Sequence, residues 1–152
     1  MWIEDYQATS GEADLVETDT SGFSYLFDLT AERLLAAWGV SRGRNKATRD
    51  AARMAGYPKA GGDAYHRGHA ISHGMGGGTD INLVPQLGSM NVGAFRQLER
   101  KAVTTPGAFY FTYWIYTGAA PVRHGPSQIP TQVDQGLLIF GRPPEVRHLP
   151  NR

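Results

Sequence analysis

The sequence predicts one α+β domain, in which a central antiparallel sheet is flanked by helices. Its 152 residues, 1–152, suffice for one hydrophobic core and are too few for two. Residues 109–116 (FYFTYWIY) are aromatic or β-branched almost throughout, which is typical of a strand. Because this run lacks polar alternation, we expect both faces of the strand to be covered, as in a central strand. Two stretches, 30–39 and 45–55, have helical character.

The first predicted helix, 30–39, is capped by Thr30 or Asp28 and stopped by Gly39. The second is basic and places small and apolar side chains on one face, before Gly56 and Pro58 end it. Ahead of these helices, residues 8–22 are rich in Thr, Ser, Gly and acidic side chains, and we expect loop or weak edge structure there.

The other elements follow from local pattern. Residues 23–29 alternate enough for a short strand, and 133–140 predict a last strand. Between the two later strands, the Gly- and Pro-rich residues 118–130 predict a loop. We expect residues 141–152 to form a tail.

Charge is distributed unevenly, although the net charge is only +1. Residues 1–32 contain eight acidic side chains and no basic one, which leaves all 15 Lys and Arg residues against six acids in the remainder. The remainder, at +9, is typical of a protein that binds a polyanion. Residues 1–22 are expected to be an acidic, flexible lead segment that covers the basic surface and competes with phosphate for it. The alternative is an acidic edge far from any site.

Several classes of protein and site are excluded. There is no cysteine, so neither a disulfide framework nor a thiolate zinc site can form. The apolar runs fall short of the ~18 residues of a membrane span, so we expect no membrane partner. The first residues are acidic and lead into no apolar stretch, which excludes a signal peptide. We therefore expect the chain to be the end piece of a longer protein.

The most informative residues are His69, Asn91 and Glu99. A histidine can take a proton from water near neutral pH. An asparagine oxygen, together with phosphate oxygens and waters, suits magnesium. Asn91 could instead be the N-cap of a helix. Glu99 lies eight residues further on, about 80° round a regular helix, and could reach the ion's water shell or pair with Arg96 or Lys101.

The residues between these positions complete a longer motif. A first strand is expected over 64–71. A glycine-rich loop then runs into a second, short strand, 80–86, which is followed by Asn91. Residues 65–103 thus resemble the bacterial non-specific DNA/RNA endonucleases of the ββα-metal (His-Me finger) superfamily. The pattern of that family is Asp-Arg-Gly-His or Asp-Gly-Gly-His, then Asn-x-x-Pro-Gln, then Asn-x-Gly-x-aromatic-x-x-Leu-Glu. The one departure is His66, which occupies the position of the first acidic residue.

The resemblance implies a ββα-metal motif over 64–103 and a hydrolytic mechanism. It implies that His69 is the general base, that Asn91 binds Mg²⁺, with Mn²⁺ as a substitute, and that Glu99 supports the site. Arg67 would bind the scissile phosphate, because guanidinium suits phosphate. We expect Gly68 to allow close backbone approach and Asn82 to fix the loop.

A basic stretch leads into this motif and is expected to bind substrate phosphates. Its alternatives are a solvated basic face or a partner for the acidic N-terminus. The residues assigned to substrate binding are Arg42, Arg44, Lys46 and Arg49.

Other interpretations of the same residues stay open. His66, His69 and His73 could bind zinc, but oxygen ligands and magnesium are preferred. The chain could be an inactive nuclease-like module that only binds nucleic acid or protein. As an enzyme, it would cleave DNA, with RNA as a second substrate. It would then be either a nutritional secreted nuclease or, as we expect, an interbacterial toxin domain. Such a toxin would be delivered into the cytoplasm of a target cell and would have a cognate immunity protein.

Overall fold

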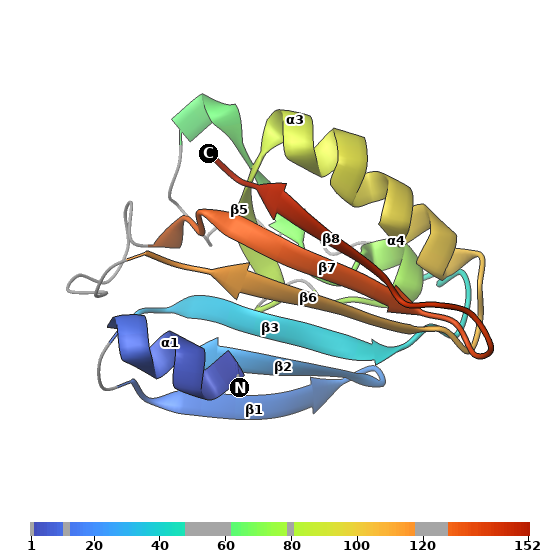
Figure 1. Ribbon diagram of the computed structural model, residues 1–152, viewed down its shortest axis with the longest axis horizontal. Coiled ribbons are helices and arrows are strands. Elements are labelled where there is room, and N and C mark those ends of the chain that lie inside the picture. The colour runs from blue at the N-terminus through green and yellow to red at the C-terminus, as the bar shows by residue number, and fades with distance from the viewer. Residues whose placement is uncertain (1, 11–12, 48–61, 79–80, 118–127) are drawn as a thin grey trace.

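The protein is described here from a computed structural model, which covers residues 2–10, 13–47, 62–78, 81–117 and 128–152. A six-stranded antiparallel sheet forms its centre, in the order β1-β2-β3-β6-β7-β8 (Figure 1). A separate antiparallel hairpin, β4-β5, lies beside it. The strands are β1 (Leu15–Thr20), β2 (Phe23–Asp28), β3 (Arg33–Val40), β4 (Tyr65–His69), β5 (Leu83–Leu87), β6 (Phe109–Ile115), β7 (Gln132–Leu138) and β8 (Glu145–Pro150).

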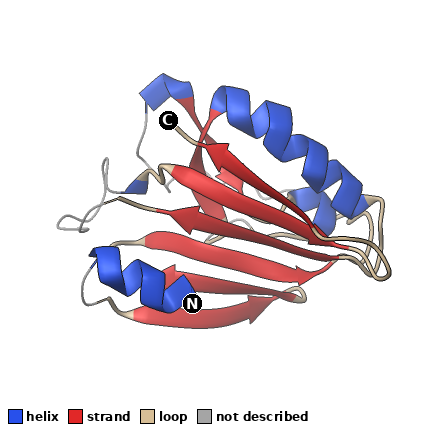
Figure 2. Cartoon of the chain, viewed as in Figure 1, coloured by secondary structure: helices blue, strands red, loops and turns tan. Residues whose placement is uncertain are grey.

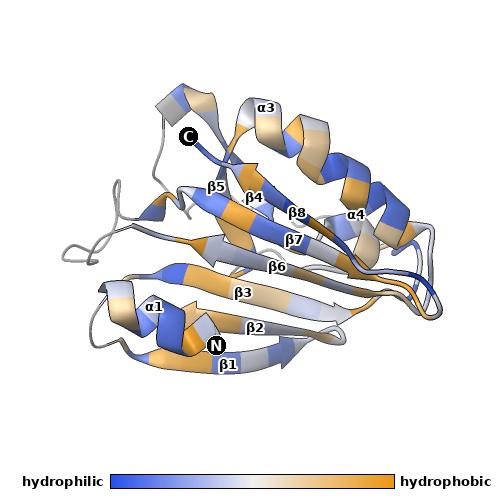
Figure 3. Ribbon diagram, in the orientation of Figure 1, coloured by the Kyte–Doolittle hydropathy of each residue, from blue (hydrophilic) through white to orange (hydrophobic). Residues whose placement is uncertain are grey.

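The two faces of the large sheet are covered by different helices (Figure 2). Directly after β5, a 16-residue helix comprises α3 (Gly88–Met90), a π turn (Asn91–Phe95) and α4 (Arg96–Val103). Hydrophobic and hydrophilic residues alternate along it (Figure 3). The other face carries α1 (Trp2–Ser10). No helix in the described ranges is long and apolar enough to span a membrane.

Strand β6 confirms the prediction of a central strand with two covered faces. Trp114 points to the long helix, where its ring centroid lies 5.7 Å from that of Phe95. Its neighbours in the strand, Phe111 and Tyr113, point the other way, where their ring centroids lie 5.6 and 5.3 Å from that of Trp2 in α1. Alternation of side chains along the strand thus gives each helix its own set of aromatic rings.

The helix predicted over 30–39 is wrong, because residues 33–40 form strand β3. This strand pairs with β2 on one side and β6 on the other. Leu34 and Leu35 are both fully buried, as are the two alanines that follow them. A short apolar run buried on both faces cannot be told from a helix by its periodicity, and sheet pairing overrides the helical propensity of Leu and Ala.

Where it is described, the N-terminal segment forms α1 and β1, and β1 is an edge strand, in line with the weak edge structure expected over 8–22. Tyr6 of α1 is only 3% exposed, and its hydroxyl donates to Asp28 and accepts from Arg33 Nε at 2.8 Å. The Arg33 guanidinium also lies over the rings of Tyr6 and Tyr116. The Tyr6 hydroxyl, bonded to a buried carboxylate and a buried guanidinium, therefore fastens α1 to the face of the sheet opposite the long helix.

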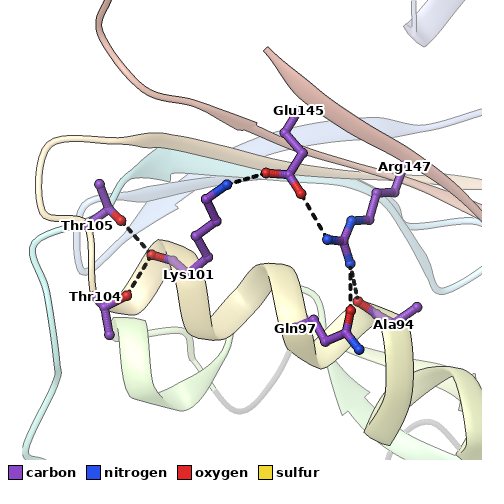
Figure 4. A network of polar contacts seen from close by, with 7 residues as sticks. All are labelled: Ala94, Gln97, Lys101, Thr104, Thr105, Glu145 and Arg147. Atoms are coloured by element: carbon purple, nitrogen blue, oxygen red, sulfur yellow. Dashed lines mark hydrogen bonds and ion pairs between the residues drawn. The ribbon is translucent and has the colours of Figure 1, made fainter. Parts of the chain in front are cut away.

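The tail predicted over 141–152 is also wrong, because residues 145–150 form edge strand β8. A network of polar contacts joins this strand to the long helix (Figure 4). Glu145 accepts from Lys101 Nζ at 2.5 Å and from Arg147 at 2.9 Å, and Arg147 in turn donates to the Ala94 carbonyl at 3.0 Å. The helix is thus held at two points along its length.

The hairpin β4-β5 confirms the two strands predicted at the start of the ββα motif. It is flanked by short 3₁₀ turns at Gly62–Ala64 and His73–Met75. The buried Asn82 side chain accepts from the Ile71 N–H at 2.7 Å and donates to the carbonyls of Ile71 and Gly78, both at 2.8 Å. Asn82 therefore holds the loop through hydrogen bonds to its backbone.

Two other predicted segments fall largely outside the described residues. Residues 48–61 include most of the predicted helix 45–55, whose first three residues are not helical. Residues 118–127 include most of the predicted loop 118–130.

The attachment of α1 can be tested with Tyr6→Phe. Loss of the hydroxyl leaves the buried Asp28 carboxylate and Arg33 guanidinium each without one hydrogen bond, which should cost roughly 1–3 kcal/mol in the free energy of unfolding. Urea denaturation measures this cost. Thr9→Ala, which removes an exposed hydroxyl from the same helix, should change stability by less than about 0.5 kcal/mol. Equal stabilities of the two variants would show that the Tyr6 network does not hold the helix.

Candidate functional site

A cleft of about 930 Å³ lies between strand β4 and the long helix. Five of the side chains predicted to form a site line it, together with Gly68. The described residues of its wall are Arg44, His66, Arg67, Gly68, His69, Ser72, His73, Gly74, Asn91, Val92, Arg96, Glu99, Arg100, Val103 and Thr104. The structure thus brings together residues that are far apart in the sequence.

Strand β4 supplies three of these side chains, His66, Arg67 and His69. Arg67 and His69 are two residues apart and therefore share one face of the strand, and both line the cleft. Arg67 is exposed, whereas His69 is half-buried and its Nε2 atom is inaccessible to solvent. His66, which alternation places on the other face, lines the cleft as well.

Packing explains why position 68 is a glycine. A Cβ atom at this position would lie 2.1 Å from the side-chain carboxamide carbon of Gln86, which is fully buried on the paired strand. The Gln86 Nε2 donates to the His69 carbonyl at 3.1 Å. The missing side chain at Gly68 therefore makes room for an amide that holds the backbone of His69 in place.

The long helix supplies Asn91 and Glu99. Asn91 is not an N-cap, because the helix already begins at Gly88 and Asn91 has helical angles (φ −59°, ψ −45°). It opens the π turn, within which Gly93 (φ −94°, ψ −114°) departs from helical geometry. Gly93 therefore interrupts the helix between Asn91 and Glu99, so the roughly 80° that separates these positions in a regular helix does not apply to them.

The Glu99 carboxyl has an unusual environment for a helix-surface residue. Burial raises its pKa from 4.5 to about 8, and the nearby Arg96 guanidinium opposes this shift only weakly. Lys101, the other predicted partner, instead pairs with Glu145. In the protein without bound ions, Glu99 is therefore largely protonated at neutral pH.

The basic residues of the cleft differ from the predicted set. Arg44 lines the wall, but Arg42 lies elsewhere, with its guanidinium close to Gly22 in the β1-β2 turn. Lys46 is exposed and is not among the described residues of the wall, and Arg49 lies outside the described residues. Two arginines of α4, Arg96 and Arg100, line the cleft and were missed. These arginines are four residues apart with Glu99 between them, so the sequence alone indicated that all three share one face of the helix.

The donor atoms of the cleft suit a sparsely ligated cation. No group of three His, Asp or Glu side chains in the described parts of the chain could hold a metal, so the zinc hypothesis finds no support among them. His73 lines the cleft, but its Nε2 lies 2.8 Å from the Ala47 carbonyl. Asn91 lies on the wall with its amide 3.4 Å from His66 Nδ1. One or two protein ligands suffice for magnesium, which keeps several of its waters.

Comparison with known proteins identifies the family. A family profile described as DNA/RNA non-specific endonuclease matches residues 18–108, more than half of the chain. The chain belongs to this family. Family membership implies phosphodiesterase activity. The search of curated proteins found no match.

A solved structure supports the fold. The chain is similar to one in the crystal structure of the EndoG/EndoGI complex, with a TM-score of 0.57 and 15% sequence identity. The match covers 100% of this chain and 80% of the other. The predicted α+β class, with a central antiparallel sheet and flanking helices, is confirmed.

The raised pKa of Glu99 predicts how the free energy of unfolding depends on pH. The folded protein holds the Glu99 proton more tightly than the unfolded chain, so this group stabilises the fold fully below about pH 4.5, and the contribution is lost as pH rises to about 8. Glu99→Gln, neutral throughout, should lose less stability over this range. Urea denaturation in EDTA at several values from pH 5 to 8 measures the difference.

The matched control for this experiment is Glu145→Gln. The pKa of Glu145 is lowered, chiefly by its hydrogen bonds from Lys101 and Arg147. Its contribution to stability is therefore nearly constant above about pH 5. The Glu145→Gln variant should keep the wild-type dependence of the free energy of unfolding on pH. If Glu99→Gln also runs parallel to the wild type, the carboxyl is ionised in the folded protein.

Proposed function

We propose that the protein is a magnesium-dependent endonuclease that hydrolyses DNA, with RNA as a second substrate, and leaves 5′-phosphates. The observation that carries the proposal is the single cleft lined by His69, Asn91, Glu99 and Arg67 in a chain of the endonuclease family. Each of these side chains has a chemical task that phosphodiester hydrolysis requires.

His69 acts as the general base. Its ring lines the cleft, and the Gln86 amide fixes its backbone. Imidazole exchanges protons near neutral pH, so it can accept the proton of the attacking water. A backbone held on both sides by the hairpin keeps the ring at a constant position relative to the phosphate.

Asn91 and the substrate would hold the ion. Its side chain, projecting from a rigid helical turn, offers one carbonyl oxygen, and waters and phosphate oxygens complete the ligand set. A bound magnesium ion supplies Lewis-acid stabilisation of the phosphate and of the departing 3′ oxygen. Glu99 would support the site by orienting waters at the ion, from the same side of the helix.

The arginines would bind and orient the polyanion. Arg67 lies beside His69 in β4, where it can bind the scissile phosphate. Arg44, Arg96 and Arg100 line the same cleft and add positive charge to its wall. Contacts to phosphates carry no sequence information, which suits a non-specific nuclease.

Replacement of the base provides the central test. His69→Ala should lower plasmid cleavage in Mg²⁺ by ~10²–10⁴-fold, the usual contribution of a general base, with an unchanged circular dichroism spectrum. Asn91→Ala should retain DNA binding and lose cleavage. His148→Ala, an exposed histidine on β8, should cleave like the wild type. A pure His69→Ala protein that cleaves normally would refute the assignment, and a folded wild type that binds DNA without cleaving it would favour the inactive binding module.

The arginine wall can be tested through salt dependence. Each lost phosphate contact should reduce the slope of log K against log salt by about 0.9, so the double variant Arg44→Ala/Arg100→Ala should reduce it by nearly two. Fluorescence anisotropy with a DNA duplex in EDTA measures the slopes. Arg142→Ala, in the β7-β8 turn, should keep the wild-type slope. An unchanged slope in the double variant would place the nucleic acid elsewhere.

The biological role proposed is that of a toxin domain, carried by a longer protein into the cytoplasm of a target cell. One comparison supports a dedicated inhibitor. The similar solved structure is the EndoG/EndoGI complex, which concerns the mechanism of EndoG inhibition. A toxin of this kind needs an immunity protein that blocks the cleft in the producing cell. Neutralisation of cleavage by the product of an adjacent reading frame would support this role; a nutritional nuclease would have no such neighbour.

A further inference from the structure

The wall of the cleft holds a second donor atom beside Asn91. His66 is exposed on β4, and its Nδ1 lies 3.4 Å from the side-chain nitrogen of Asn91. On the other side of the ring, a Cβ at position 88 would come within 3.0 Å of His66 Nε2. The glycine at position 88 therefore lets the imidazole lie against the first turn of the helix, with Nδ1 towards Asn91.

The direction of this contact indicates which nitrogen of the His66 ring carries a lone pair that faces Asn91. An amide NH₂ group only donates, so His66 Nδ1 accepts in this contact and directs its lone pair towards Asn91. The same lone pair would bind a metal ion. Rotation of the Asn91 amide by half a turn would place its carbonyl oxygen where its nitrogen now lies, next to the His66 ring.

The distance between the two donors suits one ion. Two adjacent ligands of an octahedral ion with bonds of about 2.1 Å are about 3.0 Å apart. The observed 3.4 Å is close enough for small rotations of two partly exposed side chains to close the gap. Arg67 and Arg96 line the same cleft, and their charge disfavours a cation held by neutral ligands alone, so phosphate oxygens are needed to complete the site.

We propose that His66 Nδ1 is a protein ligand of the ion, next to Asn91, and that it makes the site bind Mn²⁺ or Co²⁺ more tightly than Mg²⁺. Imidazole suits the later divalent metals, whereas magnesium prefers oxygen. Magnesium can still occupy the site through Asn91, phosphate and water. This inference rests on the proposed function for the presence of an ion in the cleft, and it adds the ion's preferred identity.

The test is Mn²⁺ binding to the protein saturated with a short DNA duplex whose linkages resist cleavage, which supplies the phosphate oxygens without turnover. Binding is followed by the electron paramagnetic resonance signal of free Mn²⁺, with Mg²⁺ as competitor and the duplex alone as the blank. The wild type should bind Mn²⁺ more tightly than Mg²⁺. His66→Ala should weaken Mn²⁺ binding by at least about tenfold, and Mg²⁺ binding much less. His66→Asp, which offers oxygen in place of nitrogen, should lower the ratio of Mn²⁺ to Mg²⁺ affinity. His148→Ala controls for loss of an exposed histidine and should match the wild type.

A spectroscopic readout identifies the ligand directly. Electron spin-echo modulation from an imidazole nitrogen should appear for Mn²⁺ in the wild type and disappear in both His66 variants. Persistent modulation, unchanged Mn²⁺ affinity in His66→Ala, or no Mn²⁺ binding by the wild type would each overturn the inference. Failure of the proposed function gives a different pattern. In that case the His69→Ala protein cleaves DNA normally, and this result does not depend on how the His66 variants bind metal.

Discussion

Three buried carboxamide side chains hold the hairpin that carries His69, and the geometry of the cleft depends on them. Asn82 closes the loop after β4, and Gln86 binds the His69 carbonyl across the strand pair. Asn151, fully buried, accepts from the Leu87 N–H at 2.8 Å and donates to the carbonyls of Pro85 and Pro130. A two-stranded hairpin is marginal in isolation, so these hydrogen bonds, which would be costly to break in a buried setting, connect it to the rest of the domain.

The long helix is positioned by a different kind of interaction. Phe95 and Leu98 are fully buried against the sheet, and the Gln135 amide donates to the Phe95 carbonyl at 2.9 Å, within the π turn. This hydrogen bond ties the irregular turn to β7. The sheet thus stabilises the irregular turn that directs Asn91 and Glu99 into one cleft, which links the core packing to the chemistry proposed for the site.

The sequence predicted best where the determinants are local. The motif residues His69, Asn82 and Asn91 have short, fixed spacings, and the hairpin and helix that carry them formed as expected. Strand β3 was mistaken for a helix because Leu34 and Leu35 have no period that separates the two structures, and only pairing with β2 and β6 decides between them. Arg96 and Arg100 were overlooked as wall residues, although their spacing places them on the helix face that carries Glu99.

The small number of donor atoms in the cleft has a thermodynamic consequence. If nucleic acid supplies most of the ligands, the ion and the nucleic acid must increase each other's affinity by the same factor, as linkage requires. Binding would then be cooperative: the resting protein would release its ion readily, and the complete assembly of ion, phosphate and His69 would form only on a substrate. A domain built in this way has little affinity for ions until it meets its target.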